Sequence, residues 1–307
     1  MQPQRRKRMS EGAAFFLVGP TASGKSAVAH VLAERRGCAV VSADSMNVYK
    51  GLDIGTAKPT KAEQRAVSYY GVDVVEPSES FNVAEWMRAV APAWSRAEIP
   101  VVCGGTGLYV KCLTEGLDSP NAENAQLRDS LAGLSVEALQ ARAAAEAAVG
   151  YAEMTDDDRE NPRRLIRLLE RGEPGASWGR GCRVRMVGLQ LERAGLHRRI
   201  EQRVERMYAA GLLAEAEQLM GESLSKTARQ AIGYAEAFAC LAGECSEAEA
   251  KERTVIRTRQ LAKRQMTWFR NQLEVEWVAV EAGASVERTA AAVEHCWERI
   301  GAGEVKR

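Results

Sequence analysis

The residues best suited to chemistry lie near the start of the chain, where residues 19–26 fit the phosphate-binding pattern G-x-x-x-x-G-K-[ST]. The glycines let successive backbone N–H groups turn toward a phosphate chain, and the N-terminus of a following helix adds partial positive charge. Lys25 is expected to reach the terminal phosphate oxygens, and the Ser26 hydroxyl to help hold Mg²⁺. The pattern predicts a diphosphate or triphosphate site formed by Gly19, Pro20, Thr21, Ala22, Ser23, Gly24, Lys25 and Ser26.

A carboxylate follows the next apolar run, where residues 39–41 lead into Ser-Ala-Asp and end at Asp44. In a parallel α/β sheet the carboxyl ends of the strands face the ligand crevice, so Asp44 is expected beside the phosphates. The alternative is that Asp44 only caps a turn. Residues 46–59 are rich in turn formers and lack a clean period, which predicts an ordered loop with a functional role.

A further apolar run, residues 100–103, ends in Gly104, Gly105 and Thr106. A standard nucleoside triphosphatase carries at such a strand end an Asp that steadies Mg²⁺. Here backbone amides and the Thr106 hydroxyl are expected to line the crevice instead. This departure indicates a use of the phosphate loop other than ATP hydrolysis.

The elements that must position these residues alternate between strands and helices. Apolar runs predict strands at residues 14–18, 39–41, 72–75, 100–103 and 183–191. Helices are predicted at residues 27–36, 82–94 with a kink at Pro92, 195–220, 233–241 and 246–271. This order predicts an α/β fold with a P-loop NTPase-like parallel-sheet core flanked by helices.

The composition shifts at about residue 119, where apolar strands disappear and Ala, Leu, Glu and Arg dominate as far as residue 181. We interpret residues 119–181 as an all-helical insertion, and residues 12–118 and 182–307 as the core with a helical C-terminal part. Residues 1–11 form a basic tail that is expected to be disordered.

Composition and charge exclude several classes of protein. The 307 residues carry a net charge of +1, so no global field attracts nucleic acid and any such surface must be local. The seven cysteines include no C-x-x-C pair and only three histidines are present, which argues against a zinc site. The chain shows neither a signal peptide nor a long apolar run, so we expect a cytoplasmic protein that does not contact membranes.

One local basic surface is predicted on the helix at residues 246–271. Between Arg253 and Arg270 there are six basic residues and no acidic one. At 100° per residue they form two stripes without compensating glutamates: Arg253, Arg257 and Arg264, and Arg259, Lys263 and Arg270. Such stripes favour a phosphate-backbone partner, and the alternative is a solvated face. Core packing is the favoured use of Trp268 and Phe269, over stacking on bases.

Five motifs give the sequence a resemblance to the bacterial tRNA dimethylallyltransferases over nearly its whole length. The longest of them, at residues 44–59, is far more specific than the phosphate loop, because 16 residues of an irregular loop rarely coincide. The other four lie at residues 19–26, 104–109, 230–234 and 258–270.

The resemblance implies transfer of a dimethylallyl group from dimethylallyl diphosphate to N6 of adenosine 37, in tRNAs that read codons beginning with U. By that similarity the phosphate loop holds the donor's diphosphate with Mg²⁺, and Asp44, Thr106 and Lys25 are catalytic. A single chain is expected to enclose one anticodon stem-loop as a monomer, with the insertion touching it. The tRNA contacts implied are Asp44, Ser45, Met46, Asn47, Thr106, Arg128, Arg163, Arg164, Leu165, Ile166, Arg167, Arg229 and Gln230.

Two departures from the family pattern leave contacts open. The insertion usually carries an Arg-Ile-His-Pro-Asn-Asp-like run, and residues 153–162 here lack the histidine. Some members have an arginine where this chain has Gln230, and Arg229 precedes it here, so either side chain can be the one that approaches substrate.

Three other functions remain compatible with the residues. A small-metabolite kinase would use residues 163–167 as an arginine-rich lid over ATP. A nucleotide-switched RNA-binding module would leave Asp44 and the loop after it without a purpose. An adenylate prenyltransferase would have little need of the two basic stripes.

Overall fold

The computed structural model of the chain describes residues 12–116, 125–171 and 184–306. The basic tail predicted at residues 1–11, and the two ends of the predicted insertion, lie outside the described residues. The chain divides into two compact units, one formed by Met1–Gly116 and Cys182–Arg307, and the other by Leu117–Gly181.

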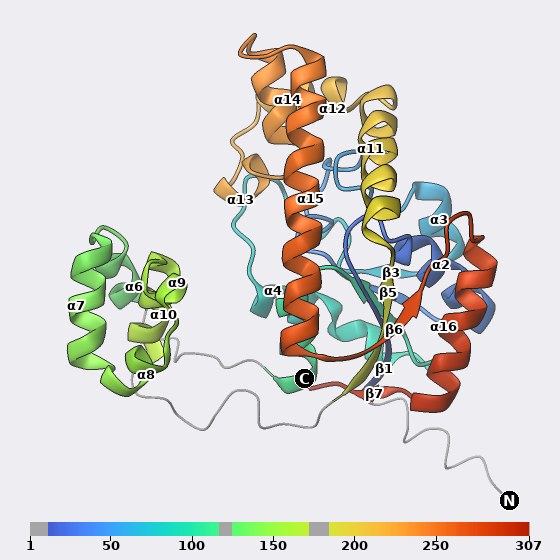
Figure 1. The fold of residues 1–307 in the computed structure, drawn as a ribbon, viewed down its shortest axis with the longest axis horizontal. Coiled ribbons are helices and arrows are strands. Elements are labelled where there is room, and N and C mark those ends of the chain that lie inside the picture. Colours follow the sequence, from blue (N-terminus) through green and yellow to red (C-terminus); the bar gives the residue numbers. More distant parts are fainter. Residues whose placement is uncertain (1–11, 117–124, 172–183, 307) are drawn as a thin grey trace, which may run out of the picture. The chain divides into compact units, whose positions relative to one another are not determined.

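The first unit is built on a seven-stranded sheet in the order β3-β2-β4-β1-β5-β6, with β7 paired to β1 (Figure 1). Every pairing is parallel except that of β7 with β1. The α/β fold with a parallel-sheet core is therefore confirmed. The strands are β1 (Ala13–Val18), β2 (Val40–Ala43), β3 (Tyr69–Tyr70), β4 (Val101–Gly104), β5 (Arg185–Gln190), β6 (Glu274–Ala279) and β7 (Gly303–Glu304).

The two central strands β1 and β4 are apolar throughout, as expected for a sheet that is covered by helices on both faces. Along β1, Phe15 and Leu17 face one buried cluster while Phe16 and Val18 face the other, as the strand period of two requires. The first cluster contains α2 (Lys25–Arg36) and α16 (Val286–Ile300), and the second contains α4 (Val83–Val90) and α5 (Gly107–Glu115). This packing holds the carboxyl ends of β1, β2 and β4 in fixed positions.

The predicted start of α4 is confirmed, with Asn82 and Glu85 forming a capping box. The helix ends at Val90 and continues as the 3₁₀ helix η1 (Ala91–Ser95), which contains Pro92. At the position of the predicted kink, the structure thus has a change from α-helix to 3₁₀ helix.

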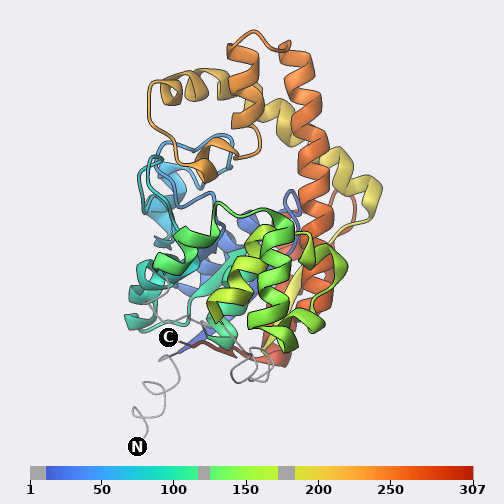
Figure 2. The ribbon, with the colours of Figure 1, turned by 90° about the vertical axis from the view of Figure 1, so that its left-hand side faces the viewer.

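The C-terminal part of the first unit is mostly helical. The predicted helix at residues 195–220 is wrong as one element, because Gly211 adopts φ of 100° and separates α11 (Arg193–Ala209) from α12 (Leu212–Met220). Beyond α13 (Lys226–Arg229) and α14 (Tyr234–Leu241), the 26-residue α15 (Glu247–Gln272) packs along α11 and reaches the sheet (Figures 1 and 2). None of the helices in the described ranges is long and apolar enough to span a membrane.

The second unit is helical in its described part. Its core consists of Leu131, Leu139, Ala143, Leu165 and Leu169, all buried. The helices are α6 (Ala125–Leu131), α7 (Val136–Glu146), α8 (Ala148–Glu153), α9 (Asp156–Arg159) and α10 (Pro162–Arg171).

Three strands differ from the prediction: β3 and β6 at the two edges of the sheet, and the two-residue β7, which was not predicted and pairs antiparallel with β1. The third strand is Tyr69–Tyr70 rather than residues 72–75, of which Val75 makes only an isolated bridge to Tyr49. The strand β6 was not predicted, because its glutamates interrupt the apolar run that marks a central strand. Edge strands are half exposed, so their sequences carry a weaker signal.

Candidate active site

The phosphate loop connects β1 to α2, as the motif predicts. Three of its residues have positive φ: Gly19 at 148°, Ala22 at 63° and Gly24 at 92°. A Cβ atom on Gly19 would lie 3.0 Å from the Leu189 carbonyl oxygen of β5, so this position needs a glycine. Ala22 holds a left-handed conformation that costs a non-glycine residue roughly 1–2 kcal/mol. Backbone strain of this kind commonly accompanies a functional loop.

The backbone amides of the loop divide into two groups. The amide of Thr21 donates to Gln265 Oε1 at 2.8 Å, and that of Ser23 donates to the Pro20 carbonyl at 3.3 Å. The amides of Ala22, Gly24, Lys25 and Ser26 have no acceptor among the described residues. Four free donors at the N-terminus of α2 form a cradle for an anion.

Two side chains of the loop support a ligand in this cradle. Lys25 is only 8% exposed and its Nζ donates to the Pro20 carbonyl at 3.1 Å. Burial lowers the pKa of Lys25, and the nearby Cys103 and Asp44 offset part of that effect. Ser23 Oγ is buried without a hydrogen-bond partner in the described structure. Because buried polar groups are nearly always satisfied, the orphaned hydroxyl points to a bound group that completes the site.

The register of the sheet places Asp44 beside this loop. Gly104 of β4 pairs with both Val18 of β1 and Ala43 of β2, so Gly19, Asp44 and Gly105 follow at one edge. Asp44 is half-buried, and its Oδ1 accepts the Met46 N–H at 2.9 Å. One oxygen of Asp44 thus caps a turn, as the alternative interpretation predicted. The other oxygen has no hydrogen bond from the described residues and remains available for chemistry.

Thr106 connects the β4 turn to the segment after Asp44. Its Oγ1 accepts the Ser45 N–H at 3.0 Å and lies 3.4 Å from the Ser45 hydroxyl. Asn47 Nδ2 donates to Ser42 Oγ at 3.3 Å, whereas Asn47 Oδ1 is buried without a partner among the described residues. The structure therefore brings Asp44, Ser45, Met46, Asn47 and Thr106 together next to the phosphate loop.

Two arginines of α11 also reach the site, and the sequence did not single them out. Arg199 Nη1 donates to the Ser23 carbonyl at 3.0 Å, and Arg203 Nη2 donates to the Thr56 carbonyl at 3.3 Å. They are four residues apart and so share one face of the helix. Burial lowers the pKa of Arg203, and the charge of Asp44 partly restores it. Together with Lys25 they make the cradle strongly cationic.

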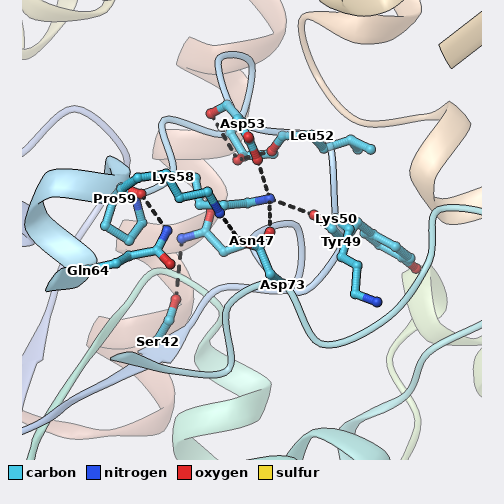
Figure 3. A network of polar contacts seen from close by, with 12 residues as sticks. Ser42, Asn47, Tyr49, Lys50, Leu52, Asp53, Lys58, Pro59, Gln64 and Asp73 are labelled. Atoms are coloured by element: carbon cyan, nitrogen blue, oxygen red, sulfur yellow. Dashed lines mark hydrogen bonds and ion pairs between the residues drawn. The ribbon is translucent and has the colours of Figure 1, made fainter. Parts of the chain in front are cut away.

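The loop at residues 46–59 is ordered around a buried ammonium group (Figure 3). The side chain of Lys58 is 1% exposed, and its Nζ donates to the Tyr49 carbonyl at 2.6 Å, to Asp53 at 2.5 Å and to Asp73 at 2.6 Å. A buried charge is tolerated only when it is paired and hydrogen-bonded, and here three acceptors surround it. Burial would raise the pKa of Asp73, but the hydrogen bonds from Lys58 and Lys61 lower it below its ordinary value.

The far end of the same loop is tied to α12 and α14. Glu215 accepts the Ile54 N–H at 2.9 Å, and the Tyr234 hydroxyl accepts the Gly55 N–H at 3.1 Å. The Tyr234 hydroxyl in turn donates to Glu215, and burial together with this contact raises its pKa. A Cβ atom on Gly55 would lie 2.3 Å from the Tyr234 ring, so the motifs at residues 44–59 and 230–234 fit directly together.

Comparison with known proteins identifies the family of this chain. The family model described as IPP transferase matches residues 47–272, and one described as Isopentenyl transferase matches residues 12–70. This chain belongs to the IPP transferase family. It is 42% identical over 281 residues to the tRNA dimethylallyltransferase of Geobacter metallireducens, covering 85% of this chain and 90% of the relative. It is 37% identical over 303 residues to that of Pelotomaculum thermopropionicum, covering 93% and 96%.

Solved structures show the same fold. The full-length tRNA isopentenylpyrophosphate transferase from Bacillus halodurans superposes on this IPP transferase with a TM-score of 0.65 at 31% identity, covering 93% of this chain and 97% of that one. A eukaryotic dimethylallyltransferase acting on tRNA gives a TM-score of 0.76 at 20% identity, covering 96% and 81%. At this lower identity the likeness concerns the fold alone.

Within this IPP transferase, the two basic stripes of α15 are less free than the sequence suggested. Arg257 pairs with the buried Glu236 and Arg259 pairs with Glu201, so the predicted absence of compensating glutamates is wrong for these two. The partners come from α14 and α11, which the sequence pattern of one helix cannot reveal. The stripe residues without an ion pair in the described structure are Arg253, Lys263, Arg264 and Arg270, all exposed.

Near these stripes, Arg229 and Gln230 end the short α13 with exposed side chains. The Gln230 carbonyl accepts Arg257 Nη2 at 3.1 Å, while neither side chain bonds another described residue. Trp268 and Phe269 pack into the core as predicted, since Phe269 is fully buried and Trp268 lies against Gly107.

In the second unit most of the predicted RNA-binding arginines are already paired. Arg128 Nη2 donates to Glu170 at 2.8 Å, Arg167 lies 3.6 Å from the same carboxylate, and Arg164 pairs with Asp158. Arg163 is exposed at the start of α10. The prediction that the Leu165 side chain contacts RNA is wrong, because this side chain is completely buried in the helical core. Ile166 packs partly against the same core. The arginines alternate with this apolar face because α10 is amphipathic.

The donor set at the loop suits magnesium. No group of three or more His, Cys, Asp or Glu able to hold a metal occurs among the described residues. The side-chain oxygens of the loop and of the adjacent Asp44 that are suited to a cation are the exposed Ser26 hydroxyl, the Ser23 hydroxyl without a partner among the described residues, and the second oxygen of Asp44. A small number of hard oxygen ligands fits Mg²⁺, because Mg²⁺ usually keeps several water ligands and is also coordinated by substrate phosphates.

Proposed function

We propose that this IPP transferase moves a dimethylallyl group from dimethylallyl diphosphate to N6 of adenosine 37, in tRNAs that read codons beginning with U, and releases diphosphate. The observation that carries the proposal is the meeting of a four-amide anion cradle with the unengaged oxygen of Asp44 at one sheet edge. The names of the most similar relatives support the same transfer.

The cradle supplies what an allylic diphosphate needs in order to react. As the C–O bond breaks, negative charge accumulates on the departing diphosphate, and preorganised donors stabilise it most. Lys25, the loop amides and the guanidinium groups of Arg199 and Arg203 are the donors that this proposal assigns to the diphosphate. Mg²⁺ bound through Ser26 and the diphosphate would add Lewis-acid stabilisation of the leaving group.

Asp44 is placed to receive the proton that the acceptor loses. The adenine exocyclic amine is a poor nucleophile because its lone pair is delocalised. As the new C–N bond forms to the allylic carbon and the C–O bond to diphosphate breaks, one N6 proton passes to the free oxygen of Asp44. General-base help of this kind contributes about 10²–10⁴-fold. Thr106 holds Ser45 and so keeps Asp44 oriented.

The tRNA is held mainly through its phosphates. We assign the exposed cations on α15, together with Arg229 and Arg163, to contacts with the anticodon stem-loop. The paired arginines of the second unit add to these contacts by exchanging their carboxylate partners for RNA phosphates: Arg128, Arg164 and Arg167. The target base has to leave the loop's stack to reach the cradle. We further propose that the enzyme acts as a monomer in the cytoplasm, which light scattering on the purified protein tests for the oligomeric state.

The decisive experiment incubates the enzyme with unmodified tRNA, dimethylallyl diphosphate and Mg²⁺, and measures diphosphate release together with the mass gain on adenosine. Equal amounts of both products support the proposal. ATP consumption without tRNA would indicate a kinase, and salt-sensitive tRNA binding without turnover would leave a binding module. Transfer to free AMP in preference to tRNA would indicate an adenylate prenyltransferase.

A further inference from the structure

Gln265 on α15 joins two loops of the site with one side chain. Its Oε1 accepts the N–H of Thr21 in the phosphate loop at 2.8 Å, and its Nε2 donates to the Gly105 carbonyl at 3.1 Å. Gly105 immediately precedes Thr106, so the second bond reaches the turn at the end of β4. The carbonyl oxygen of the Gln265 amide therefore contacts the phosphate loop, and its NH₂ group contacts the turn at the end of β4.

The turn at the end of β4 packs closely against α15 around this contact. A Cβ atom on Gly105 would lie 2.3 Å from Gln265 Nε2, and one on Gly107 would lie 2.0 Å from the Trp268 ring. Gln265 and Trp268 are three residues apart and share one face of α15. Phe269, next to them, is fully buried. This close packing of α15 against the turn at residues 104–107 holds Gln265 within hydrogen-bond distance of both loops.

The hydrogen bonds of Gln265 connect the phosphate loop with the segment that carries Asp44. From Thr21 the path passes through Gln265 to Gly105, and Thr106 continues it by accepting the Ser45 N–H at 3.0 Å. Ser45 follows Asp44 directly. The loop that holds the leaving group is thus connected, by hydrogen bonds and adjacent residues, to the carboxylate that receives the acceptor's proton.

We propose that Gln265 is a positioning residue that fixes the separation between the donor's allylic carbon and the acceptor nitrogen. The inference rests on the proposed transfer of a dimethylallyl group. When the donor's C–O bond breaks, the allylic carbon is captured either by adenosine N6 or by water. Capture by water forms a C–O bond to the water oxygen, releases its proton to solvent and yields dimethylallyl alcohol with diphosphate. A fixed separation favours the amine, because reacting atoms must be held close together in near-attack geometry.

A side chain that only stabilised the fold would leave this competition unchanged. Its loss would lower the amount of active enzyme, and would reduce both products by the same factor. A positioning residue instead changes the ratio of diphosphate released to adenosine alkylated. That ratio is independent of how much enzyme is folded, so it separates the two roles.

The test compares Gln265→Met, which keeps the length of the side chain and loses both bonds, with Gln260→Met, a matched change at an exposed position of the same helix. Each enzyme receives unmodified tRNA and dimethylallyl diphosphate, and diphosphate, dimethylallyl alcohol and alkylated adenosine are measured in one reaction. For Gln265→Met we expect kcat for transfer to fall about 100-fold, the size of effect known for small misplacements. We expect its KM for the donor to change little and dimethylallyl alcohol to become a major product. Gln260→Met should match the wild type.

Gln265→Glu provides a second variant if Gln265→Met folds poorly. Its carboxylate still accepts the Thr21 N–H but cannot donate to the Gly105 carbonyl, so the alcohol fraction should rise above the wild-type value. An unchanged product ratio in both variants, with wild-type enzyme active, overturns the role of Gln265 alone. Failure of the wild type to alkylate tRNA overturns the proposed function itself.

Discussion

Replacement of Asp44 by Asn separates the two tasks that the structure gives this residue. Oδ1 of Asp44 accepts the Met46 N–H at 2.9 Å, and an asparagine can retain this bond through its amide oxygen. The other oxygen, which accepts no bond from the described residues, becomes an NH₂ group that cannot take a proton. Asp44→Asn thus removes the base and keeps the turn, whereas Asp44→Ala removes both.

The expected sizes of the two effects differ widely. Loss of a general base lowers kcat by about 10²–10⁴-fold. Exchange of a charged for a neutral acceptor at the turn changes the free energy of unfolding by about 1 kcal/mol. Removing the negative charge near Lys25 and Arg203 leaves the cradle more cationic, so affinity for inorganic diphosphate should stay equal or increase. In Asp44→Asn, kcat should therefore fall without any loss of affinity for inorganic diphosphate.

Single-turnover transfer, calorimetric titration with inorganic diphosphate and binding of tRNA by fluorescence anisotropy measure the three quantities. Asp44→Ala should match Asp44→Asn in kcat and lose more stability in urea. Less than a tenfold fall in the single-turnover rate of Asp44→Asn, or a parallel loss of tRNA affinity, would refute the assignment of Asp44 as the base.

Three further outcomes follow from the same contacts. Lys58→Met should lower the free energy of unfolding in urea by about 1–3 kcal/mol, since it leaves the buried Tyr49 carbonyl unpaired. Asp73→Asn should destabilise the protein at pH 7, because its folded pKa lies below the ordinary value of 3.8 and its carboxylate stabilises the fold above that pH. The deficit of Asp73→Asn in thermal melts should shrink as the pH falls below 3.8, and a constant deficit would contradict the ion pairing. Arg203→Met should weaken calorimetric binding of inorganic diphosphate about 10- to 150-fold. Its control Arg206→Met, which removes an exposed arginine whose Nε donates to the Gln202 carbonyl of the same helix, should not.

The parts of the site that follow a strand could be predicted from the sequence. The phosphate loop, Asp44 and Thr106 each come directly after an apolar run, and parallel strands bring such positions to one edge. The loop at residues 46–59 was also expected to be ordered. The interaction that orders this loop could not be predicted, because Lys58 donates a hydrogen bond to Asp73, which lies in a separate segment of the chain.

The contributions of helices were harder to foresee. Five arginines lie on α11, and only tertiary packing selects Arg199 and Arg203 for the cradle. Likewise, no pattern within α15 distinguishes Gln265 from its exposed neighbour Gln260. The burial of Leu165 did carry a signal, since Leu169 follows at the helical spacing and both belong to the core of the second unit.

The paired arginines of the second unit affect how tRNA binding should respond to ionic strength. A free surface cation that meets a phosphate releases condensed counterions from the nucleic acid, and each such contact steepens the fall of affinity with salt. Arg128 and Arg167 share the carboxylate of Glu170, which is only 3% exposed. If these arginines exchange it for a phosphate, the cations released from the nucleic acid are partly offset by cations attracted to the region of Glu170. The number of ions released per complex should therefore be smaller than the number of arginines that touch the RNA.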